Sequence, residues 1–171
     1  MNPPPDLPPA AARTGDALPS PAQFAEVLHV RGQRATPQRY TILRELRLRG
    51  HHATAEAIGR SVRAQLPGTS IPTVYATLEL LVELGLARRI DTGIGPALYD
   101  GGTEPHQHMV CRRCGEVQDL PGDLDSTRLL TAAKATGFAA DGAELVISGR
   151  CARCAELDAA IAPAAGLSPT R

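Results

Sequence analysis

The stretch His106-Gln-His-Met-Val-Cys-Arg-Arg-Cys114 joins a His-x-His pair to a Cys-x-x-Cys pair, and a second pair, Cys151-x-x-Cys154, follows later. Two Cys-x-x-Cys turns can place four thiolates at the corners of a tetrahedron, which is the geometry of a closed structural Zn²⁺ site. Residues 115–150 separate the pairs and can hold a strand, a helix and a strand, so the pairs can meet. We therefore predict a structural zinc site with four ligands, Cys111, Cys114, Cys151 and Cys154.

Arginines flank both cysteine pairs, at Arg112, Arg113, Arg150 and Arg153. Their charge favours thiolates over thiols and offsets the negative charge of a zinc tetrathiolate. The alternative is a set of redox-active or incidental thiols.

The N-terminus does not resemble a secretory signal, and no run approaches the roughly 18–20 apolar residues of a membrane span. We therefore expect a cytoplasmic protein with no membrane partner, and in that compartment paired cysteines are more often metal ligands than disulfides.

The two histidines beside the first cysteine pair are not needed by the zinc. His106 and His108 alternate along an extended segment, so both side chains face the same side. Asp100 lies upstream and Asp119 follows the cysteine turn. Mixed imidazole and carboxylate ligands suit Fe²⁺, Mn²⁺ or Zn²⁺. The cluster indicates a second metal that is sensed, although each residue taken singly is equally typical of a polar surface.

The first half of the chain has the apolar spacing and capping residues of four helices. The first is expected to place Phe24, Val27 and Leu28 on one face. The N-caps of the next three are predicted at Thr36, Thr54 and Ser70. The inner stripe of the fourth is predicted to hold Val74, Leu78, Leu81 and Leu84. Residues 86–90 and 97–99 then read as two short strands joined by a turn, so the order of elements is that of a winged helix-turn-helix.

A winged helix-turn-helix would place its fourth helix in the major groove of DNA, with polar Thr73, Tyr75 and Thr77 exposed. The charge distribution agrees: residues 22–93 hold ten arginines and six acidic residues, a net +4, whereas residues 94–171 hold seven basic and ten acidic residues, a net −3. A basic half joined to an acidic half is typical of a chain that binds a polyanion at one end. The alternative is an ordinary amphipathic helix with a solvated face.

The second half mixes short strands with a helix over residues 124–136, so the predicted fold class is α+β. A winged-helix domain would be followed by a small α/β domain that contains the zinc site. The expected bounds are a Pro- and Ala-rich tail at residues 1–20, a DNA-binding domain at 21–93, the wing end and hinge at 94–100, a dimerisation and metal-binding domain at 101–156, and a tail at 157–171.

Several ordered motifs resemble those of the ferric uptake regulator (Fur) family of metal-dependent bacterial repressors. They are Gly32-Gln-Arg-Ala-Thr-Pro-Gln-Arg39, His52-Ala-Thr-Ala55, Ser70-Ile-Pro-Thr-Val-Tyr-Ala-Thr-Leu78, Leu84-Gly-Leu86, the stretch at 106–115 and Gly149-Arg-Cys151. The resemblance covers about residues 20–156. It implies a homodimer that binds a double-stranded DNA operator, with a structural Zn²⁺ and a regulatory Fe²⁺ or Mn²⁺ in each subunit. The regulatory ligands that it implies are His52, Asp100, His106, His108 and Asp119.

The same resemblance implies candidate contacts to DNA at Arg34, Arg39, Arg60, Arg63, Arg88 and Arg89, in addition to Thr73, Tyr75 and Thr77. Iron-sensing members often have Glu where this chain has Asp119, and Asp there resembles the peroxide-sensing (PerR) branch. In that branch bound iron reacts with peroxide and oxidises ligand histidines, here His52 and His106. The alternative is an iron- or manganese-uptake regulator that does not respond to peroxide.

Two other classes remain open. A pair of histidines with one carboxylate also forms the facial triad of Fe²⁺ oxygenases, but the sequence shows no cofactor motif, and we expect no enzymatic activity. A zinc-stabilised binding module with no sensing role is the third class. It predicts that Asp100→Ala or His108→Ala leaves DNA binding unchanged, whereas a sensor would lose its metal-dependent binding.

Overall fold

The computed structural model describes residues 17–49, 52–102, 106–120, 125–140, 143 and 145–161. The chain divides into two compact units. The first runs to Asp91 and continues through Pro96–Pro105, and the second comprises Thr92–Gly95 and the residues from His106 onward. Most of the two predicted tails, residues 1–16 and 162–171, and His51 lie outside the described residues.

Four helices form most of the first unit: α1 (Pro21–Val30), α2 (Pro37–Leu48), α3 (Ala55–Gln65) and α4 (Ile71–Glu83). The predicted caps are confirmed, because the side-chain oxygens of Thr36, Thr54 and Ser70 each accept a hydrogen bond from a backbone N–H in the first turn. Gly85 follows α4 with a φ of 69°, a left-handed conformation that glycine adopts without steric cost. Local chemistry therefore determines where these helices begin and where α4 ends.

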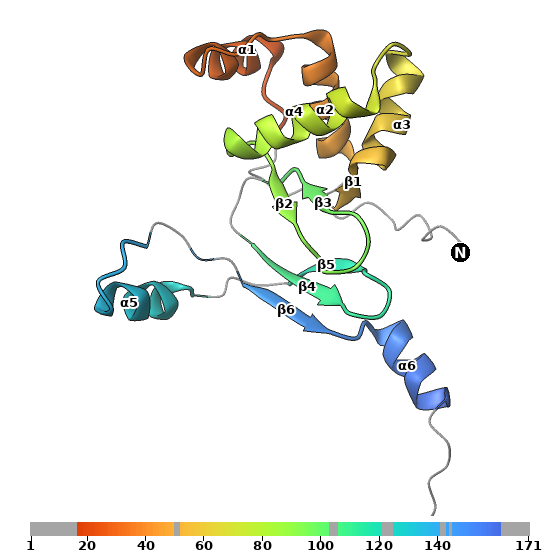
Figure 1. Cartoon of the computed structure of the whole chain (residues 1–171), viewed down its shortest axis with the longest axis vertical. Coiled ribbons are helices and arrows are strands. Elements are labelled where there is room, and N and C mark those ends of the chain that lie inside the picture. Colours follow the sequence, from red (N-terminus) through yellow and green to blue (C-terminus); the bar gives the residue numbers. More distant parts are fainter. Residues whose placement is uncertain are drawn as a thin grey trace, which may run out of the picture. The chain divides into compact units, whose positions relative to one another are not determined.

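A three-stranded antiparallel sheet of order β1-β3-β2 completes the first unit, from β1 (Ala53–Thr54), β2 (Arg88–Ile90) and β3 (Leu98–Asp100). Figure 1 shows α2, α3 and α4 gathered beside this sheet. The hairpin of β2 and β3 was predicted, whereas β1 was not. The arrangement is that of a winged helix-turn-helix, and it confirms the predicted fold class for this half of the chain.

A single apolar core lies inside the first unit and draws on every helix and on β3. Its fully buried side chains include Phe24, Leu28, Leu43, Leu78 and Tyr99. Val27, which was expected on the same helical face as Phe24, is 38% exposed. The difference follows from position, because Phe24 and Leu28 are four residues apart and lie one turn above each other, whereas residue 27 is rotated toward the edge of that face.

The second unit is built on a three-stranded sheet of order β5-β4-β6. Its strands are β4 (Gln107–Cys111), β5 (Val117–Leu120) and β6 (Val146–Gly149), and its helices are α5 (Thr127–Ala135) and α6 (Ala152–Ile161). β4 pairs antiparallel with β5 and parallel with β6. The central strand β4 therefore follows directly after His106, carries His108 near its start and ends at Cys111.

The chain remains helical past the point where a tail was expected. α6 starts directly after Cys151, and the N–H of Ala155 donates to the carbonyl of Cys151 over 2.9 Å. Residues 157–161 are thus part of a helix that begins within the second cysteine pair. None of the described helices combines the length and the apolar character that crossing a bilayer requires.

Candidate metal centres and nucleic-acid interface

The four cysteines converge at one end of the second unit's sheet. The parallel register pairs Cys111 of β4 with Gly149 of β6, and the N–H of Arg112 donates to the carbonyl of Gly149 over 2.9 Å. This pairing brings the first cysteine turn next to the start of α6, which carries the second pair. The four sulfurs all lie within 4.8 Å of one another.

The spacing of the sulfurs fits a tetrahedral zinc ion. Zn–S bonds of about 2.3 Å imply S···S edges of about 3.8 Å. The sulfurs of Cys114 and Cys151 are 3.7 Å apart. None of the cysteines forms a disulfide, and they come from two separate turns, as a closed site requires. The cluster fits the structural zinc site that the sequence predicts.

Backbone amides favour the ionised form of Cys111, one of the two buried cysteines of the cluster. Burial acts to raise the pKa of the Cys111 thiol, but hydrogen bonds from the amides of Cys151, Cys114 and Arg113 outweigh it and lower the pKa to about 6. Thiolate, and not thiol, is the form that binds zinc. These amides therefore favour the form of Cys111 that a zinc site requires.

Two histidines and one carboxylate meet on the second unit's β4–β5 hairpin. The antiparallel register places His108 opposite Asp119. The Nε2 atoms of His106 and His108 lie 3.5 and 3.9 Å from the same oxygen of Asp119, and the two imidazole rings meet edge to face at 4.6 Å. Both histidines are buried. Alternation along an extended segment therefore has the predicted effect, since both imidazoles point to one side.

The first unit holds a histidine and a carboxylate of its own that lie close together. β1 pairs with β3 so that Ala53 lies opposite Tyr99, and the same register brings His52 next to Asp100. Asp100 is fully buried, and its Oδ1 accepts a hydrogen bond from the N–H of Gly102 at 2.7 Å. β1 positions His52, which directly precedes it. The sequence did not predict this strand, because two residues are too few to show an alternation of apolar and polar side chains.

Two polar side chains of α4, Thr73 and Tyr75, form hydrogen bonds with other residues of the first unit. The hydroxyl of Tyr75 donates to the carboxylate of Glu56 on α3 at 2.7 Å, which lowers the pKa of Glu56 and raises that of Tyr75. The hydroxyl of Thr73 lies 2.8 Å from that of Ser70. Both Thr73 and Tyr75 are exposed, as predicted.

The prediction that Thr77 is exposed was wrong, since only 3% of it is accessible. Position 77 falls three residues after Val74 and four before Leu81, so it lies on the inner stripe of α4 despite its polar side chain. It cannot contact DNA without a rearrangement of the core.

Half of the six candidate arginines are exposed on the first unit. Arg34, Arg60 and Arg89 are exposed, whereas Arg39, Arg63 and Arg88 are partly buried. Two of them have internal roles: Arg39 donates to the carbonyl of Arg34 at 2.7 Å, and Arg89 lies 3.9 Å from Glu79. Glu79 also accepts a 2.6 Å hydrogen bond from Tyr99.

Comparison with known proteins agrees with this architecture. The model of the ferric uptake regulator family matches residues 30–148. This chain belongs to the ferric uptake regulator family. It is 36% identical over 133 residues to the peroxide operon regulator of Bacillus subtilis, with 77% of this chain and 90% of that protein covered. It is 34% identical over 136 residues to the transcriptional regulator FurA of Mycobacterium bovis, with 79% and 92% covered.

A solved structure of a zinc uptake regulator complexed with zinc and DNA resembles the chain with a TM-score of 0.56 and 28% identity, and the match covers 81% of this chain and 95% of that one. The chain is thus a metal-responsive regulator of the Fur family. Relatives named for peroxide and for Fur both match at similar identity, so the comparisons do not separate the two branches.

Proposed function

We propose that this protein is a homodimeric, metal-dependent DNA-binding repressor that senses peroxide through Fe²⁺. The observation that carries this proposal is the convergence of His106 and His108 on Asp119 within the second unit. Two buried imidazoles and a carboxylate form a donor set that suits Fe²⁺ or Mn²⁺. Family resemblance adds His52 and Asp100 as the remaining ligands.

The regulatory role follows from which residues supply the ligands. A metal held by residues of both units would favour one arrangement of the units over all others and so shift the population toward the DNA-binding form. When bound, Fe²⁺ would supply the electron that reduces peroxide. His52 and His106 are the imidazoles that we propose become oxidised: as the O–O bond of peroxide breaks, one oxygen would add to the ring carbon between the two nitrogens and the other would leave as water. The oxidised ring would be a poorer metal ligand. The metal would then be released, and with it the DNA.

DNA binding is proposed for the exposed N-terminal half of α4. Thr73 and Tyr75 present hydroxyl groups there, and Arg60 lies exposed on the neighbouring helix α3. Guanidinium groups contact phosphates without regard to sequence, and hydroxyl groups can reach base edges. Arg34 and Arg89 are the other exposed cations that we assign to the backbone of DNA.

The homodimer is proposed to form along β6. This strand is an edge of its sheet, all four of its residues are exposed, and two of them are Val146 and Ile147. An exposed apolar edge strand is a template for pairing and is usually covered in a native protein. A second copy of the chain would cover it. Ile147→Lys is expected to convert the dimer to a monomer in sedimentation or light-scattering measurements.

The test is DNA affinity of the zinc-loaded protein, titrated anaerobically with Mn²⁺ or Fe²⁺ and then exposed to a small excess of peroxide. Peroxide should abolish binding by the Fe²⁺ form, leave the Mn²⁺ form intact, and add oxygen mass to peptides that contain His52 or His106. The matched variant Asp119→Glu keeps the carboxylate but lengthens it by one methylene, and we expect it to retain metal-dependent binding with a weaker response to peroxide.

The second candidate is an iron- or manganese-uptake regulator, which the similarity to FurA favours. It predicts equal DNA binding with either metal and no effect of peroxide. That result would refute the sensor and leave the family assignment intact. We propose no catalytic turnover in either case: in the sensor, oxidation of the protein's own histidines consumes the protein, and the uptake regulator carries out no reaction.

A further inference from the structure

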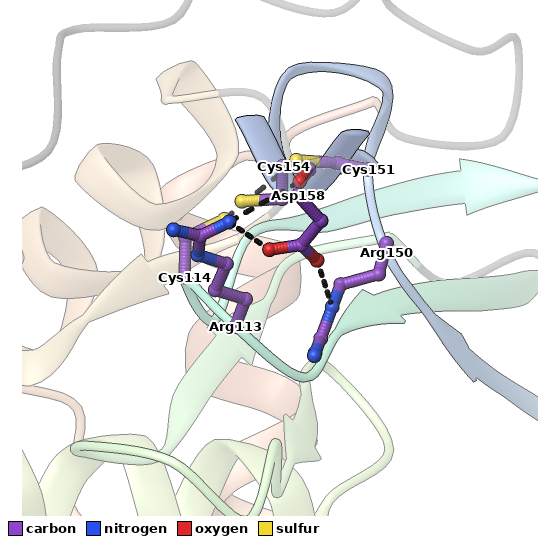
Figure 2. Close-up of polar contacts among 6 residues, drawn as sticks. All are labelled: Arg113, Cys114, Arg150, Cys151, Cys154 and Asp158. Carbon is purple, nitrogen blue, oxygen red and sulfur yellow. Dashed lines mark hydrogen bonds and ion pairs between the residues drawn. The ribbon is translucent and has the colours of Figure 1, made fainter. Parts of the chain in front are cut away.

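One carboxylate connects the two cysteine pairs on the outer side of the zinc centre. Asp158 lies on α6, one turn after Cys154. Its Oδ1 pairs with the Nη1 of Arg113, which belongs to the first cysteine turn, and its Oδ2 accepts from the Nε of Arg150 at 2.8 Å, directly before the second pair (Figure 2). The Nη1 of Arg113 also donates to the carbonyl of Cys154 at 3.3 Å.

The arrangement differs from an ordinary surface ion pair in what it connects. Its three side chains are 34–48% exposed, and an isolated pair at such a surface contributes only about 0.2–1 kcal/mol. Here the carboxylate belongs to the second cysteine segment and pairs with Arg113 of the first, while its pair with Arg150 lies within the second segment and orients the carboxylate. Separation of the two segments, which would open the zinc centre, would break the pair between Asp158 and Arg113.

A groove beside the cluster gives this arrangement a second consequence. It has a volume of about 200 Å³, and its lining includes Cys111, Cys151, Glu116 and Arg150. Because Arg150 lines this groove, its pair with Asp158 also restrains a side chain beside two of the four sulfurs, those of Cys111 and Cys151.

We propose that Asp158 is a positioning residue of the zinc centre and slows the release of zinc by holding the two cysteine segments together. The inference rests on the assignment of the cysteine cluster as a zinc site. Simple electrostatics gives the opposite expectation, because a carboxylate near a negatively charged zinc tetrathiolate repels it and draws two arginines away from the sulfurs. Faster zinc release after loss of the Asp158 charge would therefore indicate that Asp158 holds the segments together, whereas slower release would indicate a purely electrostatic effect.

The experiment measures zinc release from the full-length protein into an excess of the chromophoric chelator 4-(2-pyridylazo)resorcinol. Asp158→Asn removes the charge with little change in shape, and Glu156→Gln is the matched control on the exposed surface of the same helix. We expect Asp158→Asn to release zinc about three- to tenfold faster, and the control to behave as the unmodified protein, at low ionic strength. Added salt should bring the unmodified protein toward the variant.

A second set of variants distinguishes a direct pairing from a general loss of structure. Arg113→Gln and the double variant Arg113→Gln/Asp158→Asn complete a cycle across the two segments, in which the two effects should be less than additive. Circular dichroism confirms that each variant is folded, and elemental analysis gives its zinc content.

Release from Asp158→Asn at the same rate as from Glu156→Gln, or more slowly, would overturn the proposal while the zinc assignment stands. If the unmodified protein purified with far less than one zinc per chain and bound none when it was supplied, the zinc assignment itself would fail, and the proposed role of Asp158 with it.

Discussion

Removal of zinc should unfold the second unit of this protein and leave the first unit folded. The physical basis is the uneven distribution of buried apolar side chains. The core cluster, from Phe24 to Tyr99, belongs to the first unit. Among the described residues of the second unit, the buried hydrophobic side chains are Val110, Val117 and two of the cysteines, Cys111 and Cys154.

The magnitudes show why the metal dominates. Full burial of two valines contributes roughly 3–6 kcal/mol. Binding of structural zinc contributes about 10–16 kcal/mol in small zinc domains, which are unfolded without the metal. The stability of the second unit thus depends more on the four thiolates than on its apolar contacts, whereas the first unit has a continuous core of its own.

The assay is hydrogen exchange of the full chain, followed by mass spectrometry, with and without a strong chelator and a thiol reductant. Peptides from β4 (Gln107–Cys111) and β6 (Val146–Gly149) should lose their protection when zinc is removed. Peptides from α4 (Ile71–Glu83) should keep theirs. Protein concentration has to be held constant, because dimer formation also stabilises the folded state.

Either of two results would refute this reasoning. Retained protection of β4 without zinc would mean that the sheet is stable without its metal. Equal loss of protection in β4 and α4 would mean that the two units unfold as one, so that the separate core of the first unit gives it no independent stability.

Three further outcomes are expected. Leu78→Ala, at a fully buried position of α4, should destabilise the first unit by about 2–5 kcal/mol in thermal unfolding and leave the zinc content unchanged. Burial and the carboxylate of Glu79 raise the pKa of Tyr99, so its neutral form is favoured in the fold. Stability from this group is complete below the ordinary tyrosine pKa of about 10 and is lost as the pH rises further, so Tyr99→Phe should show a shallower decrease in melting temperature between about pH 9 and pH 11. Glu56→Ala removes a negative charge beside Tyr75, so the affinity of this variant for a random-sequence duplex, measured by fluorescence anisotropy, should rise about threefold. Glu83→Ala, at the C-terminal end of α4, should leave the affinity unchanged. An unchanged affinity in Glu56→Ala would argue against DNA binding at this face.

Local signals made the first unit largely predictable. Thr36, Thr54 and Ser70 cap their helices by bonds to residues only a few positions away, so the sequence contains both partners of each bond. The cysteine spacing predicted the zinc cluster for a similar reason, since the ligand number and geometry of zinc restrict the ways in which two pairs can meet.

Features that depend on tertiary pairing were harder to predict. β1 is only two residues long and is defined by its partner β3, and Asp158 has no motif of its own. A spacing of four residues after Cys154, on a helix, was the available signal for Asp158. Thr77 was misjudged because its polar side chain was given more weight than its position on α4. Whether the five proposed regulatory ligands act together stays a prediction.

The central strand of the second unit has a consequence for how a cell supplies this protein with metals. β4 carries His108 and ends at Cys111, and three residues of strand span about 10 Å. The structural zinc centre and the proposed regulatory centre therefore share one short piece of backbone. A chain that gave up its zinc would lose the alignment of its histidines as well, so the proposed regulatory metal would bind only to a zinc-loaded chain. In a zinc-starved cell, the chain would accumulate without a working regulatory site.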